Sequence, residues 1–515
     1  MIGPRSVLRR AFDAVDRGLD RTLGPSLNPM DRLGALGFFF YWIVAVSGIY
    51  LFIPFDTGVH GAYASVERIT HAQWYAGGVM RSLHRYASDA MVAAMLLHMA
   101  REWAHDRYRG VRWFSWLTGV PVLWLLYVSG ITGYWLVWDK LAQYVAIASS
   151  ELLDWLGVFG EPVARNFLAP DALSDRFFTL LVFMHIAVPL FLLFAMWIHL
   201  QRISRPKVNP PRALAAATLA AMLAVSLWRP ALSQGPADLT TVPSEVGLDW
   251  FYLLLYPLID LWSHGWIWGL LAAFTVMLLA MPWLPPFRRA RAAEVTLAQC
   301  NGCGRCVDDC PYNAVTLVPR RDGRPFSHEA QVDPGLCAAC GICMGACPTS
   351  TPFRRSSALA TGIDLPERSL TWLRERVLAV TGGTKSGSGV LAFACSHAAD
   401  TGALVSAGAG VVQLPCVAMM PPSLIDFVLS RELAAGVLVV GCAESGCHHR
   451  LGVAWMRERI AGARDPYLRA RVPRERLATV WAGPSDAGRV IAAHDELKAR
   501  LAGLAVAAPA RRAVS

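Results

Sequence analysis

The sequence predicts a multi-domain protein: an all-α transmembrane bundle of about six helices, then a small α+β domain, then an α/β domain with an open sheet. Three observations support this order. Apolar runs of about 20 residues, the length that spans a bilayer, occur only before residue 288. All 12 cysteines lie at or after residue 300. Beyond residue 388, short apolar runs alternate with helix-like segments, as in a parallel sheet. A chain of 515 residues also exceeds one ordinary domain.

The membrane part begins without a cleavable signal. Residues 1–31 are polar and Arg-rich and lack a short apolar core with a small-residue cleavage site, so the first span is expected to be an uncleaved anchor. The expected spans are 32–54, 79–103, 113–138, 176–201, 212–229 and 264–286.

Basic residues in the loops predict the orientation. They lie before span one, between spans two and three, between spans four and five, and after span six. The other loops are poor in Lys and Arg. The positive-inside rule then predicts that both termini lie in the cytoplasm. The helices are expected to lie in the inner membrane of the cell. The net charge of +10 is spread among these loops, which disfavours a nucleic-acid partner. Cytoplasmic thiols stay reduced, which favours metal clusters over disulfides.

Two expected spans each carry a pair of histidines fourteen positions apart: His84 and His98 in the second, His185 and His199 in the fourth. Fourteen residues make nearly four helical turns, so each pair shares one face, with a rise of about 21 Å between its members. Two such helices can hold two stacked haems, each iron taking one imidazole from each helix. The alternative is four ordinary helix histidines satisfied by neighbouring hydroxyls or carbonyls.

Glycines repeat the same interval in the other two helices. Gly34 and Gly48 lie in the first span, and Gly119 and Gly133 lie in the third. A missing side chain at each level would let a flat macrocycle approach the backbone. Ordinary packing of small residues between helices is the alternative.

Residues 30–205 resemble the cytochrome b of the bc complexes, especially the split chloroplast type. The segments "MRSLHRYAS" and "GITGYWLVWD" and the two histidine pairs carry the resemblance. It implies a four-helix bundle with two bis-histidine b haems, in which Arg81 and Arg101 balance haem propionates and Pro189 bends the fourth helix. A six-coordinate iron has no open position, so such haems carry electrons.

Residues 206–287 resemble a shortened form of the family's later helices. The family has a Pro-Glu-Trp-Tyr motif beside its outer quinol site, and "LDWFYLLLYPL" (248–258) is the matching segment here. Asp249 takes the Glu position and could accept a quinol proton. Leu248 and Phe251 depart from the family motif, and a short interfacial segment with Trp and Tyr at the headgroups is the alternative. No cysteine lies in a span, so no thioether-linked haem is expected.

Two copies of a C-x2-C-x2-C-x3-C-P motif follow: "CNGCGRCVDDCP" (300–311) and "CAACGICMGACP" (337–348). They resemble the bacterial two-cluster ferredoxins and so imply an α+β ferredoxin-like domain. In that pattern three cysteines of each run bind one cluster and the fourth binds the other. The implied ligands are Cys300, Cys303, Cys306 and Cys347 for one [4Fe–4S] cluster, and Cys337, Cys340, Cys343 and Cys310 for the second. Zinc is the alternative metal.

In the last part of the chain, "GVLAFAC", "GVVQLPC" and "GVLVVGC" are expected to be buried parallel strands. They end in Cys395, Cys416 and Cys442, and Cys447 follows. Ends of parallel strands meet at one sheet edge, so these four thiols could bind a [2Fe–2S] cluster. Four independent buried cysteines are the alternative.

This part is similar to the iron–sulfur delta subunit of methyl-viologen-reducing hydrogenases, on the segments "LPC" and "GVLVVGCAESGCHH". The resemblance implies a cytoplasmic redox partner such as a heterodisulfide-reductase-like flavoprotein. Many members have a C-x2-C pair at the first strand, where only Cys395 remains here. His397, His448 and His449 are possible replacement ligands, although ordinary surface histidines are the favoured interpretation. No Gly-rich phosphate loop occurs, so no nucleotide is expected.

These parts predict electron transfer between the quinone pool and a cytoplasmic iron–sulfur or flavoprotein partner, with quinone or quinol as substrate. Two alternatives remain: a bc-type quinol-oxidising subunit that works with a Rieske protein, and a membrane scaffold that docks a reductase without quinone turnover. A homodimer is implied by the bc family alone. The expected domains are the N-terminal segment 1–31, the haem bundle 32–205, two further spans in 206–290, the ferredoxin domain 291–355, a linker 356–387 and the α/β domain 388–515.

Overall fold

The computed structural model describes residues 3–24, 27–167, 173–243, 245–285, 290–382, 389–444, 446–484 and 486–512. The chain folds into two compact units. The first is helical and holds most of the chain up to residue 285. The second contains residues 286–515 together with Arg10–Ala14 and Arg202–Arg205. The three-part architecture expected from the sequence is confirmed, since a helical part is followed by a small region of short strands and then by a parallel sheet.

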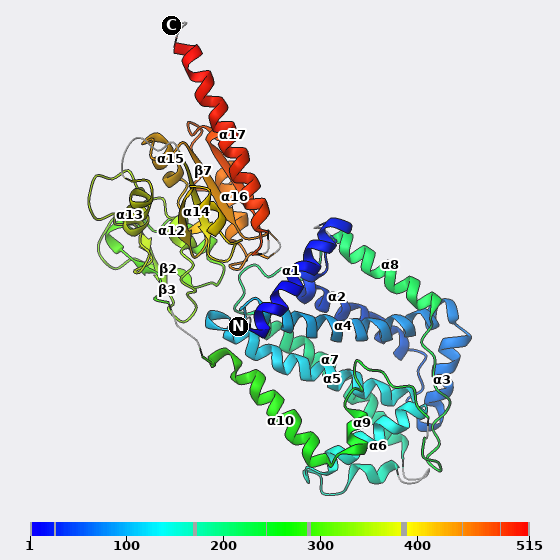
Figure 1. Cartoon of the computed structure of the whole chain (residues 1–515). Helices are drawn as coiled ribbons and strands as arrows, with labels where there is room; N and C mark the ends of the chain where they lie inside the picture. Colours follow the sequence, from blue (N-terminus) through cyan, green and yellow to red (C-terminus); the bar gives the residue numbers. More distant parts are fainter. Residues whose placement is uncertain are drawn as a thin grey trace. The chain divides into compact units, whose positions relative to one another are not determined.

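Four long helices form the centre of the helical unit (Figure 1). They are α2 (Leu33–Phe52), α4 (Val79–Ala104), α5 (Trp113–Val137) and α7 (Asp175–Leu200). Helix α2 packs along α4, and α5 packs along α7. Large apolar side chains such as Phe40, Met91 and Phe178 are buried between them. Their burial replaces lipid contact by close packing inside the bundle.

Four segments are long and apolar enough to cross a membrane: Met30–Phe52, Gly110–Val137, Asp175–Leu200 and His264–Trp283. Two of the six expected spans form helices without meeting that measure. Helix α4 has 26 residues but carries charged side chains along its length. Helix α8 (Arg212–Trp228) is apolar but has only 17 residues. The last membrane helix is α10 (His264–Ala280).

Four further helices lie outside the expected spans. They are α1 (Pro4–Thr22), α3 (Val59–His71), α6 (Lys140–Asp154) and α9 (Tyr256–Leu261). Helix α6 begins at Asp139, whose carboxylate accepts a hydrogen bond from the backbone N–H of Ala142 at 2.8 Å. That carboxylate also accepts from the N–H of Gln234 at 2.9 Å. One aspartate thus caps a helix and holds the 230s segment to it.

Single helical turns complete this unit and the next. A π-helical turn, Trp74–Gly78, precedes α4. The 3₁₀ turns are Met30–Arg32, Gly110–Arg112, Val163–Phe167, Met281–Trp283, Leu297–Gln299, Val417–Met419 and Arg474–Arg476.

The ferredoxin-like region is built from two similar halves. Strands β2 (Val315–Pro319) and β3 (His328–Val332) pair antiparallel, with Val315 opposite Val332. Short helices α11 (Arg305–Asp309) and α12 (Ile342–Ala346) each lie inside one cysteine motif. Strand β1 (Glu294–Val295) pairs with β4 (Ile363–Asp364), so part of the expected linker belongs to this fold. Helix α13 (Leu370–Val380) follows, capped by Ser369.

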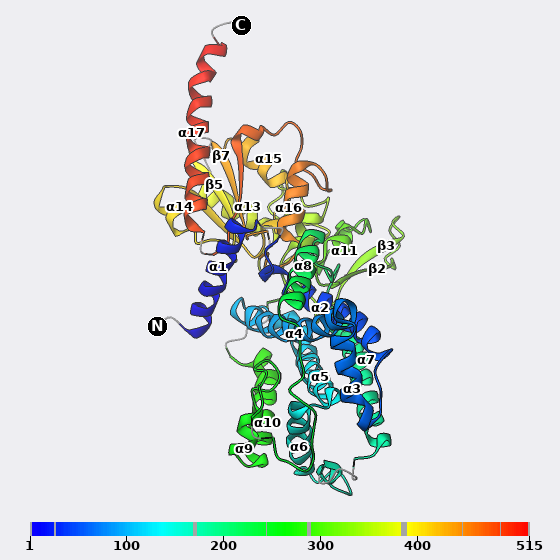
Figure 2. The ribbon, with the colours of Figure 1, turned by 90° about the vertical axis from the view of Figure 1, so that its right-hand side faces the viewer.

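The last region contains a four-stranded parallel sheet with the order β6-β5-β7-β8. Strands β5 (Val390–Cys395), β6 (Gly410–Leu414) and β7 (Gly436–Gly441) are the three expected strands, and β8 (Leu477–Trp481) adds a fourth. Every residue of β5 and β7 is buried. Figure 2 shows this sheet between α17 on one side and α15 and α16 on the other. The helices are α14 (Gly402–Ser406), α15 (Ser423–Ser430), α16 (Gly452–Ala461) and α17 (Ala487–Arg512).

Candidate haem and iron–sulfur sites

The first histidine level brings α4 and α7 together. The ring centroids of His84 and His185 are 6.2 Å apart, and the ring planes are inclined by 66°. Two imidazoles that bind one metal ion through Nε2, with metal–nitrogen bonds of about 2 Å, place their ring centres roughly 6 Å apart. The spacing of these rings therefore fits one iron held between them.

Hydrogen bonds fix the orientation of three of the four imidazoles. Nδ1 of His84 lies 3.0 Å from the carbonyl oxygen of Val44, and Nδ1 of His185 lies 3.0 Å from that of Ser129. Nδ1 of His199 lies 3.1 Å from the hydroxyl of Thr118. A carbonyl oxygen can only accept, so Nδ1 of the first two rings donates and Nε2 keeps its lone pair for a metal.

The four glycines lie against the imidazole rings. The nearest atom to a Cβ added at Gly48 would be Cε1 of His84, at 3.0 Å, and at Gly133 it would be Cε1 of His185, at 2.8 Å. Gly34 and Gly119 stand in the same relation to His98 and His199, at 3.5 and 3.4 Å. Each glycine thus makes room for the histidine of its own level.

The two arginines assigned to haem propionates already have partners in the protein. Arg101 is buried, and its guanidinium donates to Asp16 at 2.8 Å and to Asp31 at 2.5 Å. Burial raises the pKa of Asp16 to about 6, although Arg101 acts in the opposite direction. Arg81 donates to Thr70 at 2.5 Å and to Ser233 at 2.8 Å. Their role at propionates stays a prediction.

Asp249 lies in a buried polar group that the sequence did not reveal. Its carboxylate, only 6% exposed, accepts a hydrogen bond from the hydroxyl of Tyr134 and forms an ion pair with Arg85 at 2.8 Å. Arg85 also pairs with Asp89 at 3.3 Å. The ion pair and the tyrosine hydroxyl fix the position of the Asp249 carboxylate. Arg85 and Asp89, both in α4, could have been suspected from their i, i+4 spacing next to His84.

Two tyrosines fix the 248–258 segment on the bundle. The hydroxyls of Tyr252 and Ser88 lie 2.6 Å apart, and those of Tyr256 and Ser149 lie 2.6 Å apart. A Cβ at Gly130 would overlap the Tyr252 ring, at 2.0 Å from its nearest carbon. Trp250, by contrast, is exposed. The segment therefore buries Asp249 and both tyrosines and presents Trp250 outward.

The eight ferredoxin cysteines surround two cavities. Cys300, Cys303, Cys306 and Cys347, the predicted ligands of the first cluster, line one of them. Burial and the three neighbouring thiols raise the pKa of Cys306 to about 12. The thiolate form of Cys306 is therefore disfavoured until a metal cluster replaces the proton, because metal binding releases the protons of its thiol ligands.

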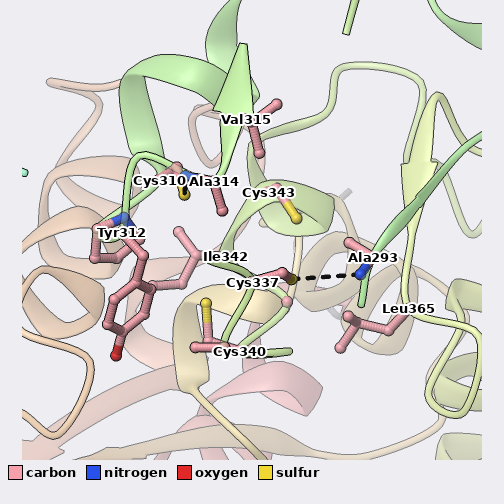
Figure 3. Close-up of a pocket in the computed structure, with 13 residues that line it drawn as sticks. Ala293, Cys310, Tyr312, Ala314, Val315, Cys337, Cys340, Ile342, Cys343 and Leu365 are labelled. Carbon is pink, nitrogen blue, oxygen red and sulfur yellow. Dashed lines mark hydrogen bonds between the residues drawn. The ribbon is translucent and has the colours of Figure 1, made fainter. Parts of the chain in front are cut away.

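The second cavity is lined by Cys310, Cys337, Cys340 and Cys343, the predicted ligands of the second cluster (Figure 3). Backbone N–H groups reach two of the sulfurs: Ala293 donates to Cys337 at 3.4 Å, and Ala314 donates to Cys310 at 3.3 Å. Such N–H groups stabilise the negative charge of ligated sulfur. In both cavities the cysteines present are a donor set suited to a [4Fe–4S] cluster.

The backbone of the two motifs repeats with the sequence. Gly302 has φ +67°, and a Cβ there would lie 2.2 Å from the carbonyl oxygen of His328. The same place in the second motif is taken by Ala339, with φ +50°. Gly304 and Gly341, with φ +77° and +74°, start the helices α11 and α12. These left-handed positions turn each motif around its cavity.

The four cysteines of the α/β region come together at one edge of the sheet. The sulfurs of Cys395 and Cys442 are 3.4 Å apart. Cys447 interacts with both Cys442 and Cys416, and all four side chains are buried. The hydrogen bond with Cys395 is the main cause that raises the pKa of Cys442 to about 12. Four buried thiols in one group are a suitable donor set for an iron–sulfur cluster, whose type stays a prediction.

Three histidines that the sequence favoured as ordinary surface residues also meet at this edge. His397 follows Cys395, and His448 and His449 follow Cys447. The ligand nitrogens of the three imidazoles lie within 4.8 Å of one another. Sequence distance hid this group, because about fifty residues separate His397 from the other two.

Comparisons with known proteins match three successive segments of the chain. Residues 19–206 match the family model of cytochrome b/b6/petB, residues 299–351 that of the 4Fe-4S dicluster domain, and residues 390–505 that of the methyl-viologen-reducing hydrogenase delta subunit. Cytochrome b6 of Heliobacterium mobile is 30% identical over 135 residues, which is 26% of this chain and 63% of that relative.

A solved structure described as a hyperthermophilic respiratory Complex III is 19% identical and covers 53% of this chain and 82% of its own, with a TM-score of 0.42. That score is too low to indicate a shared fold. The chain thus combines, in order, a segment similar to cytochrome b/b6, a segment similar to dicluster 4Fe–4S ferredoxins and a segment similar to the delta subunit of methyl-viologen-reducing hydrogenase.

Proposed function

We propose that this protein is a membrane-bound electron-transfer subunit that connects the quinone pool to a cytoplasmic iron–sulfur or flavoprotein partner. Two b haems, two [4Fe–4S] clusters and a [2Fe–2S] cluster would, when bound, supply the one-electron redox centres. The protein would lie in the inner membrane with both termini in the cytoplasm. The partner would be heterodisulfide-reductase-like or hydrogenase-like, which the match to the hydrogenase delta subunit supports.

The observation that carries the proposal is the pairing of His84 with His185. Their rings are spaced for one iron, and each Nδ1 donates to a backbone carbonyl so that Nε2 is available as a ligand. Ordinary helix histidines need neither feature. At the second histidine level, His98 and His199 also each lie beside a glycine.

The residues of the chain have distinct parts in this function. The carbonyls of Val44 and Ser129 hold two imidazoles in one tautomer, and the twelve cysteines would hold the three clusters. At the quinol-facing end, Asp249 would take a proton from a quinol hydroxyl while Arg85 and Tyr134 orient its carboxylate.

The test is an optical spectrum of the purified, oxidised protein before and after addition of a quinol analogue. We expect b-type haem absorbance to appear on quinol addition. Asp249→Asn should slow that reduction by about a hundredfold, the usual size of a general-base contribution, with the haem content unchanged. Glu161→Gln changes an exposed carboxylate that is distant from Asp249 in the sequence, and its haems should be reduced at the wild-type rate.

Haems that stay oxidised with quinol but become reduced with dithionite would contradict the quinone link. A protein that binds no haem would contradict the histidine assignment as well. Equal rates for Asp249→Asn and wild type would remove Asp249 from the quinol site and leave the rest of the proposal intact.

A further inference from the structure

The three histidines beside the C-terminal cysteines form a compact group of their own. The rings of His397 and His448 stack in parallel, with centroids 3.6 Å apart and planes within 4°. The ring of His449 stands nearly perpendicular to both, at 80° and 83°. His449 is buried, and the other two are half-buried.

The spacing of the nitrogens suits one metal ion. The ligand nitrogens of the three rings lie within 4.8 Å of one another. Around a tetrahedral ion with metal–nitrogen bonds of 2.0–2.1 Å, the nitrogens are about 3.4 Å apart. To bind one ion, the rings of His397 and His448, which are partly exposed, would turn out of their parallel stack so that a nitrogen of each ring points to the ion.

A partner on another region of the fold fixes the third histidine. Nδ1 of His449 lies 2.8 Å from the hydroxyl oxygen of Tyr312, and both residues are buried. A metal-bound imidazole almost always uses its second ring nitrogen in such a hydrogen bond, which sets its tautomer and direction. Tyr312 also lines the cavity of the second ferredoxin cluster.

The neighbouring cysteines do not need the histidines as ligands. Cys395, Cys416, Cys442 and Cys447 already form a group of four thiols through their mutual contacts. The histidines follow Cys395 and Cys447 in the chain and form a second group with a different donor type. Imidazole nitrogen suits zinc and other late divalent transition metals, whereas thiolates suit the cluster.

We propose that His397, His448 and His449 bind one divalent transition-metal ion of the zinc class, separate from the iron–sulfur clusters. The ion joins the segment after β5 to the segment after β7, and so holds together the two segments that carry Cys395 and Cys447. With three protein ligands, it keeps a fourth position for water or another small ligand.

The test uses the full chain with its iron–sulfur clusters loaded, because empty cysteine sites also bind zinc. After a chelator wash, the protein is incubated with Zn²⁺, and zinc and iron are measured by mass spectrometry. We expect one zinc per chain, with X-ray absorption showing nitrogen or oxygen neighbours at about 2.0 Å and no sulfur at about 2.3 Å. The double variant His397→Ala/His448→Ala should lose the zinc and keep the iron.

His328→Ala is the matched control, since His328 is an exposed histidine of the same unit, on β3, and it should keep the zinc. Three results would overturn the proposal: no zinc in the wild type, sulfur neighbours around the zinc, or unchanged zinc in the double variant. A changed electron paramagnetic resonance spectrum of the C-terminal cluster in His397→Ala, without zinc in the wild type, would assign the histidines to that cluster instead. If the double variant loses iron, His397→Gln, which keeps a polar side chain, decides: it should lose the zinc and keep the iron, and unchanged zinc would overturn the proposal.

Discussion

At the scale of single residues, the two histidine levels are expected to be independent. His84 and His185 form one level and His98 and His199 the other, and each ring lies beside its own glycine. Replacing His84 by Ala should therefore remove about half of the b-type absorbance and leave the other half. His98→Ala should remove the other half. The haem that remains in each variant should have a different reduction potential, because burial and nearby charges differ between the levels.

The measurement is a redox titration of haem absorbance in both variants, with His60→Ala as control because His60 is exposed. Full absorbance in His84→Ala would show that this histidine is not a ligand. Loss of all absorbance in either single variant would show that the two levels do not form separately.

A second residue-level prediction concerns Asp364, which accepts hydrogen bonds from the backbone N–H groups of Leu365 and Leu370. Burial raises its pKa from 3.8 to about 6 in the folded protein. The folded state therefore binds this proton more tightly than the unfolded state. The resulting stabilisation is full below pH 3.8 and is lost as the pH rises through about 6.

As the pH rises from 5.5 to 7.5, loss of the proton from this carboxyl should lower the free energy of unfolding by about 1 kcal/mol. Asp364→Asn should remove that part of the pH dependence. The measurement is thermal unfolding of the protein at the two pH values, followed by the cluster absorbance. Glu375→Gln, on the exposed side of α13, should keep the wild-type difference. A difference that persists in Asp364→Asn would assign it to another group.

At the scale of elements, the contact between α5 and α7 depends on the absence of a side chain at Gly133. A methyl group there would lie 2.8 Å from Cε1 of His185, closer than real Cβ contacts. Gly133→Ala should shift this imidazole, lower the haem content and destabilise the bundle by about 1–3 kcal/mol. The ratio of haem to protein and the thermal loss of haem absorbance measure both effects.

Gly269→Ala is the control, because nothing lies within 4 Å of a Cβ at this position of α10. If both variants retained haem equally, the glycine would be a feature of ordinary helix packing and not of the haem site.

Helices α11 and α16 are joined by a buried ion pair that the sequence did not suggest. Arg459, with no exposed side-chain surface, donates to Asp309 and also to the carbonyl oxygen of Ala418 at 2.9 Å. Arg464 pairs with the same carboxylate at 2.8 Å. Burial lowers the pKa of Arg459, and Asp309 raises it. The charge is stable here only because its partners are fixed.

Arg459→Met should therefore cost about 3–5 kcal/mol, since it leaves part of the charge of Asp309 without a partner. Arg457→Met, on the same helix, breaks an ion pair with Glu444 whose members are about half exposed, and it should cost less than about 1 kcal/mol. Chemical unfolding followed by the cluster absorbance compares the two. Similar costs would mean that burial does not set the strength of the pair.

These elements show what the sequence could predict. Periodicity of 3.6 residues and runs such as "GVLVVGC" predicted the long helices and three of the four sheet strands, because one face or both faces of each must be apolar. Local signals were too weak for α6, which begins at a single aspartate cap. The polar group around Asp249 and the histidine group around His449 join residues far apart in the chain, and pairing at that distance depends on the fold.

At the scale of the whole molecule, the asymmetry of charge and cysteine along the chain gives a test of topology. All 12 native cysteines lie at or after residue 300, so the membrane half offers no thiol of its own. A single cysteine introduced there reports its side of the membrane through reaction with an impermeant maleimide. The positive-inside rule predicts that all native cysteines face the cytoplasm.

We expect the variant Glu161→Cys to be labelled in intact cells, because this exposed residue lies between α6 and α7, in a loop with few basic residues. Asn209→Cys, exposed and close to the basic residues that follow α7, should be labelled only after the cells are opened. Wild-type protein should stay unlabelled in intact cells, which controls for the native thiols. The reverse pattern would place the iron–sulfur unit outside the cell membrane, where a cytoplasmic partner could not reach it. Labelling of both variants in intact cells would mean that residues 161 and 209 lie on one side, so that α7 does not span the membrane and its two histidines cannot lie at two depths.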